Sequence, residues 1–246
     1  MIDSPERPLR SPPQNIGFTL IELLVVIAII GVLTALAIPA VNKARIKSMR
    51  AVTVGNLHQV NLAFTGYVND NGWVLPVGYQ YADTNRPELN WRQLLVNGGY
   101  LGKPDKPVLS DGPWCFEYSV LGSPLQRRNN PRLPKWDQNT FGANAQVLSL
   151  NPSGQPVSNE TRMLQFRSPS RTILMAEGST LGGSDCRFNG LFYGTPASNL
   201  PNYLEGGLVS CLFLDGHVDT MRLADWPPCA VNPVGSDSWY FWKGRE

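Results

Sequence analysis

One acidic side chain lies at the edge of a long apolar run. Glu22 directly precedes Leu23–Val41, in which Thr34 is the only polar side chain. A carboxylate at the centre of a bilayer costs about 2.5–3.5 kcal/mol on insertion scales. A charged residue in such a segment therefore marks a functional site and needs a partner.

The spacing of nearby residues suggests that partner. A cut between Gly17 and Phe18 would create an α-amino group at position 18, one helical repeat before Glu22. Residues at positions i and i+4 lie on one face of a helix, so the amine and the carboxylate could neutralise each other. We hypothesise this pairing, within one subunit or between neighbours. The alternative is a carboxylate that extends to the membrane interface.

The elements that position Glu22 form one long predicted helix. Residues 1–17 are polar and rich in proline, so they are not expected to be helical. Residues 18–41 match the length of a membrane-spanning helix, with an expected kink at Pro39. Residues 42–70 continue the helix with apolar side chains at three- and four-residue steps, and turn residues end it.

The remaining residues, 71–246, predict a globular head with little helical periodicity. A short helix is expected at 88–97 and a hairpin at the Asp215-Gly216 turn. The other expected strands are Trp114–Leu121, Gln146–Leu150 and Thr172–Ala176. The helix is too long for a bilayer, so its second half must pack on this head. The predicted fold class is α+β: a long N-terminal helix, membrane-spanning in its first half, on a small antiparallel β-sheet head with long loops.

The residues around the proposed cut carry a family resemblance. Gly17-Phe18-Thr19-Leu20-Ile21-Glu22, followed by an apolar run that contains Pro39, resembles the processing site of type IV pilins and type II secretion pseudopilins. The resemblance implies cleavage after Gly17 by a prepilin peptidase and N-methylation of Phe18. It also implies that Glu22 assists assembly of a filament.

The resemblance extends into the head. Asn56–Pro76 is similar to the helix end of pilin-like proteins typical of planctomycetes and their relatives. Leu212–Val218, with the sequence LFLDGHV, resembles their C-terminal Asp-Gly hairpin. Those proteins often carry a histidine nine residues before the Asp-Gly pair, where this chain has Glu205.

The resemblance implies a structural role, without catalytic residues or a required cofactor. The implied partners are the prepilin peptidase, membrane lipid and other pilin or pseudopilin subunits that pack through the N-terminal helix. The implied location is the inner membrane, with a single pass and the head in the periplasm. The formal net charge of +2 gives no indication of nucleic-acid binding.

Two features of the sequence favour other readings. Lys43, Arg45, Lys47 and Arg50 follow the apolar run, whereas the leader offers fewer basic residues, so the positive-inside rule alone would place the head in the cytoplasm. Ala35-Leu36-Ala37 resembles a signal-peptidase site, and cleavage there would release a soluble exported protein. An uncut, membrane-anchored binding protein is the other alternative.

The head offers few groups for other chemistry. Asp215, His217 and Asp219 alternate and would share one face of a regular strand, so they are the candidates for a metal or acid–base site, although a simple hairpin is the simpler reading. Asp185 and Glu205, with the two hairpin aspartates, could supply oxygens to calcium, but their spacing gives no calcium motif.

The cysteines and the aromatic tail leave further alternatives open. Cys115, Cys186, Cys211 and Cys229 could form disulfides after export or remain buried thiols. The tail, with Trp226 and Trp239–Trp242, is expected to close the core of the head. A partner-binding patch is the alternative.

Overall fold

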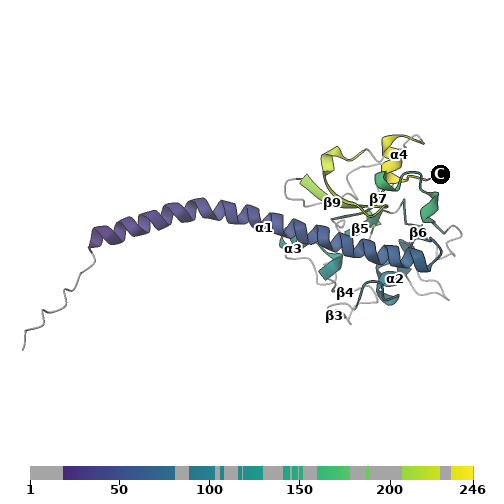
Figure 1. The fold of residues 1–246 in the computed structure, drawn as a ribbon, viewed down its shortest axis with the longest axis horizontal. Coiled ribbons are helices and arrows are strands. Elements are labelled where there is room, and N and C mark those ends of the chain that lie inside the picture. The colour runs from purple at the N-terminus through teal and green to yellow at the C-terminus, as the bar shows by residue number, and fades with distance from the viewer. Residues whose placement is uncertain are drawn as a thin grey trace, which may run out of the picture. The chain divides into compact units, whose positions relative to one another are not determined.

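A computed structural model gives the structure of the chain. It describes residues 19–80, 89–102, 106–107, 116–117, 119–129, 141–144, 146–148, 150–151, 160–177, 187–188, 207–227 and 234–245. The chain divides into two compact units, Met1–Arg45 and Ile46–Glu246. A single helix, α1 (Leu20–Asp70), contributes residues to both, which confirms the predicted long helix (Figure 1).

In the second unit, α1 buries one stripe of side chains. The buried positions follow each other at steps of three and four residues, the repeat that places side chains on one helix face. They are Thr53, Asn56, Leu57, Val60, Ala63, Phe64 and Val68. The stripe packs in a core with side chains from the sheet and from helix α2 (Trp91–Asn97), where Phe64 contacts Trp91 at 5.6 Å between ring centroids.

The main sheet has five strands in the order β10-β9-β7-β5-β8. Neighbouring strands are antiparallel, except that β8 pairs with β5 in parallel at the sheet edge. The strands are β5 (Phe141–Asn144), β7 (Ile173–Glu177), β8 (Arg187–Phe188), β9 (Leu208–Phe213) and β10 (Val218–Arg222). The structure thereby confirms the α+β class and the predicted hairpin at residues 215 and 216.

Shorter elements complete the head. One small sheet has the order β2-β1-β6, and another pairs β3 with β4. These strands are β1 (Tyr79–Gln80), β2 (Leu89–Asn90), β3 (Lys106–Pro107), β4 (Phe116–Glu117) and β6 (Leu150–Asn151). The short helical elements are η1 (Ser119–Leu121), α3 (Pro124–Asn129), η3 (Met163–Gln165), η4 (Pro169–Arg171), η6 (Leu223–Asp225) and α4 (Asp237–Trp242).

Some expected strands were wrong in extent. Residues 146–148, inside the predicted strand Gln146–Leu150, form a turn in which the N–H of Leu148 donates to the carbonyl of Asn144 at 2.9 Å. Among the described residues of the predicted strand Trp114–Leu121, Phe116–Glu117 is a strand, and a 3₁₀ turn follows at 119–121. The helix expected at 88–97 begins at Trp91, because Asn90 caps it through the N–H of Gln93.

The central strands β5, β7 and β9 are buried on both faces of the sheet. Alternating residues of one strand point to opposite faces. On β9, Leu212 joins the core that includes α1, whereas Val209, Cys211 and Phe213 join a second core. The second core contains Trp226, Phe241 and Trp242, so α4 covers the sheet face opposite α1 (Figure 1). This confirms that the aromatic tail closes the core of the head.

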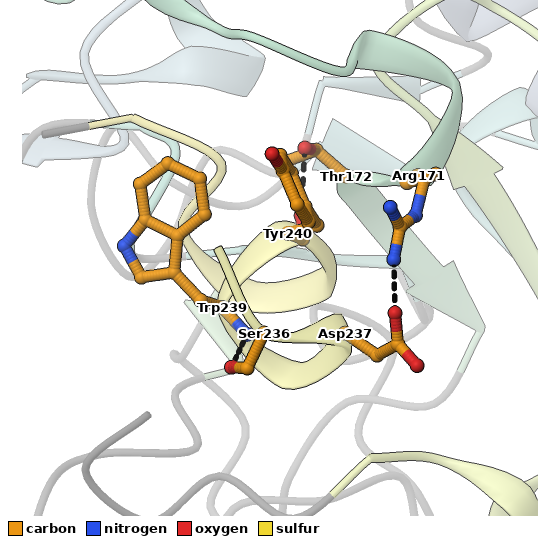
Figure 2. A network of polar contacts seen from close by, with 6 residues as sticks. All are labelled: Arg171, Thr172, Ser236, Asp237, Trp239 and Tyr240. Carbon is orange, nitrogen blue, oxygen red and sulfur yellow. Dashed lines mark hydrogen bonds and ion pairs between the residues drawn. The ribbon is translucent and has the colours of Figure 1, made fainter. Parts of the chain in front are cut away.

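Polar contacts attach α4 to the start of β7 (Figure 2). The hydroxyl of Thr172 donates to the carbonyl of Tyr240 at 2.8 Å, and the guanidinium of Arg171 lies 4.4 Å from the centre of the Tyr240 ring. Arg171 also forms an ion pair with Asp237. Ser236 caps α4 by accepting the N–H of Trp239 at 3.1 Å. The contacts fix the position of α4 on the sheet.

A buried polar network joins α1 to the sheet. The carboxylate of Glu177, which is 1% exposed, accepts hydrogen bonds from the hydroxyl of Ser123 and from the N–H of Ser210, the latter at 3.3 Å. The hydroxyls of Thr53 and Ser123 lie 3.1 Å apart. The network thus connects α1, the segment before α3, and strands β7 and β9.

Candidate functional site

The first turn of α1 holds Glu22 through its neighbour Thr19. The carboxylate of Glu22 accepts the backbone N–H of Thr19 at 2.9 Å and its hydroxyl at 2.7 Å. The N–H of Glu22 in turn lies 3.3 Å from the Thr19 hydroxyl oxygen. This reciprocal arrangement is a capping box, and it places a negative charge at the positive end of the helix dipole. The Glu22 carboxylate therefore has hydrogen-bond partners within its own chain.

Thr19 is the residue of this site that the sequence interpretation missed. The signal was present, because Thr19 and Glu22 have the Ser/Thr-x-x-Glu spacing that opens many helices. The predicted partner of Glu22, an α-amino group at residue 18, requires a cut chain. Gly17 and Phe18 lie outside the described residues, so cleavage and methylation there stay predictions.

After this first turn, the helix presents apolar side chains on every side. Leu23, Ile27, Ile30 and Leu33 are all more than half exposed. Among the described residues, α1 is the helix that is long and apolar enough to cross a membrane. Its most apolar 18-residue segment has no residue buried within the chain. An apolar surface of this extent is stable only against lipid or other apolar helices.

Two residues inside the apolar run could disturb the helix, but it continues through both. The hydroxyl of Thr34 donates to the carbonyl of Ile30 at 2.7 Å, so its polar group is satisfied within the helix. Pro39 lies inside α1, and the element is unbroken there. The kink expected at Pro39 stays a prediction.

The Asp215–His217 pair belongs to the hairpin turn. One carboxylate oxygen of Asp215 accepts the backbone N–H of His217 at 3.1 Å and lies 2.6 Å from Nδ1 of its ring. The His217 ring stacks on Phe213, at 4.3 Å between centroids. Asp219 instead accepts the N–H of Thr220 at 2.7 Å. These contacts support the simple hairpin.

No group of three or more His, Cys, Asp or Glu side chains that could hold a metal occurs among the described residues. The candidate set Asp215, His217 and Asp219 therefore does not converge on a metal site. Asp185 and Glu205, the other calcium candidates, lie outside the described residues.

The hairpin turn also packs against α1. Gly216 has a φ of 94°, and a Cβ atom there would lie 2.5 Å from the side-chain amide nitrogen of Asn61. The positive φ of the turn therefore favours glycine at this position, and the Asn61 side chain packs directly against it.

Cys211 is a free thiol buried on β9. Its burial, with smaller contributions from Asp219 and Glu177, raises the pKa of the thiol well above its ordinary value. Because the thiolate is the reactive form, this burial lowers the reactivity of the Cys211 thiol, which packs in the core of the head. Cys115, Cys186 and Cys229 lie outside the described residues.

Comparison with known proteins agrees with these features. A family model described as the prokaryotic N-terminal methylation motif matches residues 14–38. The type II secretion system core protein G of Pseudomonas aeruginosa is 32% identical over 115 residues, which are 44% of this chain and 74% of that protein. The core protein G of Klebsiella pneumoniae is 29% identical over 146 residues, or 58% of this chain and 89% of that protein.

A pilin is also similar to the chain. The type IV major pilin protein PilA of Myxococcus xanthus is 35% identical over 82 residues, and the match spans 29% of this chain and 37% of the pilin. No solved structure matches the chain.

The chain therefore belongs to the pilin and pseudopilin family. This family is structural and not catalytic, and its members are subunits of pilus-like or pseudopilus filaments. Together with the apolar N-terminal helix, family membership indicates that the chain is anchored in a membrane.

Proposed function

We propose that this chain is a structural filament subunit that is cut between Gly17 and Phe18, N-methylated at Phe18, and assembled through pairing of Glu22. The apolar half of α1 would then pack with the same half of neighbouring subunits, and the head would form the surface of the filament. No catalytic residue is assigned to the head.

The observation that carries this proposal is the position of Glu22. It is the single charged side chain between Thr19 and Val41, at the start of a surface that is otherwise apolar. Its contacts with Thr19 satisfy part of its hydrogen-bonding capacity but leave its charge without an opposite charge. An unpaired charge among apolar helices is strongly disfavoured, so an α-amino group exposed by cleavage is the natural partner.

The proposed processing also implies where the chain lies and which proteins it meets. The cleavage site must face the cytoplasm to meet a prepilin peptidase, which places the head in the periplasm and the apolar helix in the inner membrane before assembly. The basic cluster after the span opposes this orientation under the positive-inside rule. Lys43, Arg45 and Lys47 are exposed on α1, where they can contact lipid phosphates.

The first test is to determine the N-terminus of the chain purified from membranes. We expect the mature chain to begin at Phe18, with an added methyl group detected by mass spectrometry. A chain that begins at Met1 would support the uncut anchored protein. A chain that begins near Ile38 would support the exported soluble protein, and either result would contradict the proposed function.

The second test concerns assembly. Glu22→Ala removes the carboxylate and leaves the amine without its partner, so we expect the fraction of chain in sheared filaments to fall about a hundredfold while cleavage continues. Thr34→Val is the matched control, because the Thr34 hydroxyl bonds to its own helix, and it should assemble normally. Normal assembly of Glu22→Ala would refute the pairing.

A further inference from the structure

Two Asn-Gly pairs lie at the ends of helices in the described part of the head. Asn71-Gly72 follows the last residue of α1, and Asn97-Gly98 lies at the end of α2. All four residues are exposed to solvent. Both pairs also lie at the negative end of a helix dipole, so the dipole acts on both alike. A difference in reactivity between the pairs must therefore come from their local hydrogen bonds.

An asparagine that precedes glycine can lose its side-chain amide without an enzyme. The backbone nitrogen of the glycine attacks Cγ of the asparagine and forms a nitrogen–carbon bond. The proton of that nitrogen passes to the amide nitrogen, which leaves as ammonia. Water then opens the cyclic imide at either of its carbonyls, and the product is aspartate or isoaspartate. Glycine permits this attack because no Cβ atom shields its nitrogen.

The attacking nitrogen is free in one pair and bound in the other. The N–H of Gly98 donates to the carbonyl of Leu94 at 3.0 Å. The N–H of Gly72 has no hydrogen-bond partner among the described residues. A backbone N–H that is held by a carbonyl must leave its acceptor before its nitrogen can attack, and that separation costs free energy. The nitrogen of Gly72 does not have this cost.

The leaving group of Asn71 is also held by an acceptor. Its amide nitrogen donates to the carbonyl of Tyr67 at 2.8 Å. This nitrogen gains a proton and positive charge as it leaves, and hydrogen bonds from charged donors are stronger than those from neutral donors. The carbonyl of Tyr67 therefore stabilises the departing group. The side chain of Asn97 has no such partner in the described part of the chain.

We propose that Asn71 is a site of spontaneous deamidation, through which the head gains a carboxylate at the end of α1. The new carboxylate is adjacent in sequence to Asp70, whose own carboxylate accepts the hydroxyl of Tyr100 at 2.9 Å. A second negative charge at the negative end of the helix dipole is unfavourable. The amide that donated to Tyr67 is lost as well. Deamidation therefore lowers the stability of the head, whether or not the chain has entered a filament.

The test compares the two pairs within one sample. The full chain in detergent is incubated in mildly alkaline buffer, and peptide mass spectrometry follows conversion at each asparagine. We expect Asn71 to convert about fivefold faster than Asn97, because reaction at Asn97 must also break a backbone hydrogen bond. In a sample unfolded by denaturant the two rates should become equal, because both pairs have the same residues.

Three results would overturn the proposal. They are no conversion at Asn71, conversion of Asn97 as fast as that of Asn71 in the folded chain, and a difference that persists in the unfolded chain. Two variants test the effect on the head. Asn71→Asp should lower its Tm, whereas Asn71→Gln retains an amide and should lower the Tm less. Equal Tm values for the two variants would show that the added charge does not destabilise the head.

Discussion

The two halves of α1 belong to one helix and have opposite relations to their surroundings. Residues 20–41 expose aliphatic side chains around the whole helix, whereas residues 46–70 bury a single stripe in the head. Helical structure is the same in both, so the difference lies in the pattern of side chains. An apolar surface on all sides requires lipid or neighbouring helices, while a stripe requires a protein core.

Substitution in the buried stripe should have the largest effect on the stability of the head. Phe64→Ala would leave a cavity next to Trp91, and we expect it to lower the free energy of unfolding of the head by about 3–5 kcal/mol. The measurement is chemical denaturation of the full chain in detergent, followed by tryptophan fluorescence. Val26→Ala, in the exposed half, should leave this free energy unchanged. Equal losses in the two variants would mean that the halves do not differ as described.

A charge in the apolar half tests the other side of the comparison. Ile29→Asp places a carboxylate within the predicted span, at a cost of about 2.5–3.5 kcal/mol near the bilayer centre. We expect less of the chain in the membrane fraction after alkaline extraction, with the unfolding of the head unchanged. Leu62→Asp, which is 71% exposed on the second half, is the control and should remain in the membrane fraction. Retention of both variants would argue against a membrane span.

A smaller loss of stability is expected at Thr53, a polar residue of the buried stripe. Thr53→Val keeps the shape of the side chain but removes the hydroxyl that contacts Ser123 and the carbonyl of Met49. Loss of a buried hydrogen-bonding group should lower the free energy of unfolding by about 1–2 kcal/mol. Denaturation of the head measures this change, and Thr34→Val in the exposed half is the control. A stabilised Thr53→Val head would show that the network is not favourable.

The smallest loss of stability is expected at α4, the second helix that covers the sheet. Ser236→Ala removes the cap of a short helix and should lower the free energy of unfolding by about 1 kcal/mol, detected as a lower Tm. Ser236→Asp retains an acceptor for the N–H of Trp239 and should behave like the original chain. If Ser236→Ala and Ser236→Asp lower the Tm equally, loss of the helix cap does not explain the lower stability.

The sequence predicted the elements whose patterns are long or whose turns are specific. The apolar run and the three- and four-residue steps after it gave the whole of α1, and Asp215-Gly216 gave the hairpin between β9 and β10. These signals are local, because they depend on side-chain periodicity and on backbone conformations that few residues adopt.

The missed features depend on contacts between distant residues. Phe141–Asn144 contains glycine and asparagine, which are poor strand formers, yet it is strand β5 because β7 and β8 pair with it on either side. Glu177 is an acidic residue in a buried strand, and its partners Ser123 and Ser210 are far from it in sequence. No local pattern identifies such partners.

The network around Glu177 fixes the register of residues 46–70 of α1 on the head. Thr53 contacts Ser123, and the amide of Asn56 donates to the carbonyl of Gly122 at 2.9 Å, so these polar positions fit the head in one register. A slip of one turn would bring the apolar Leu57 towards the hydroxyls and leave buried polar groups without partners. The polar side chains of Thr53 and Asn56 therefore act as a register mark, which selects one alignment of residues 46–70 of α1 on the head.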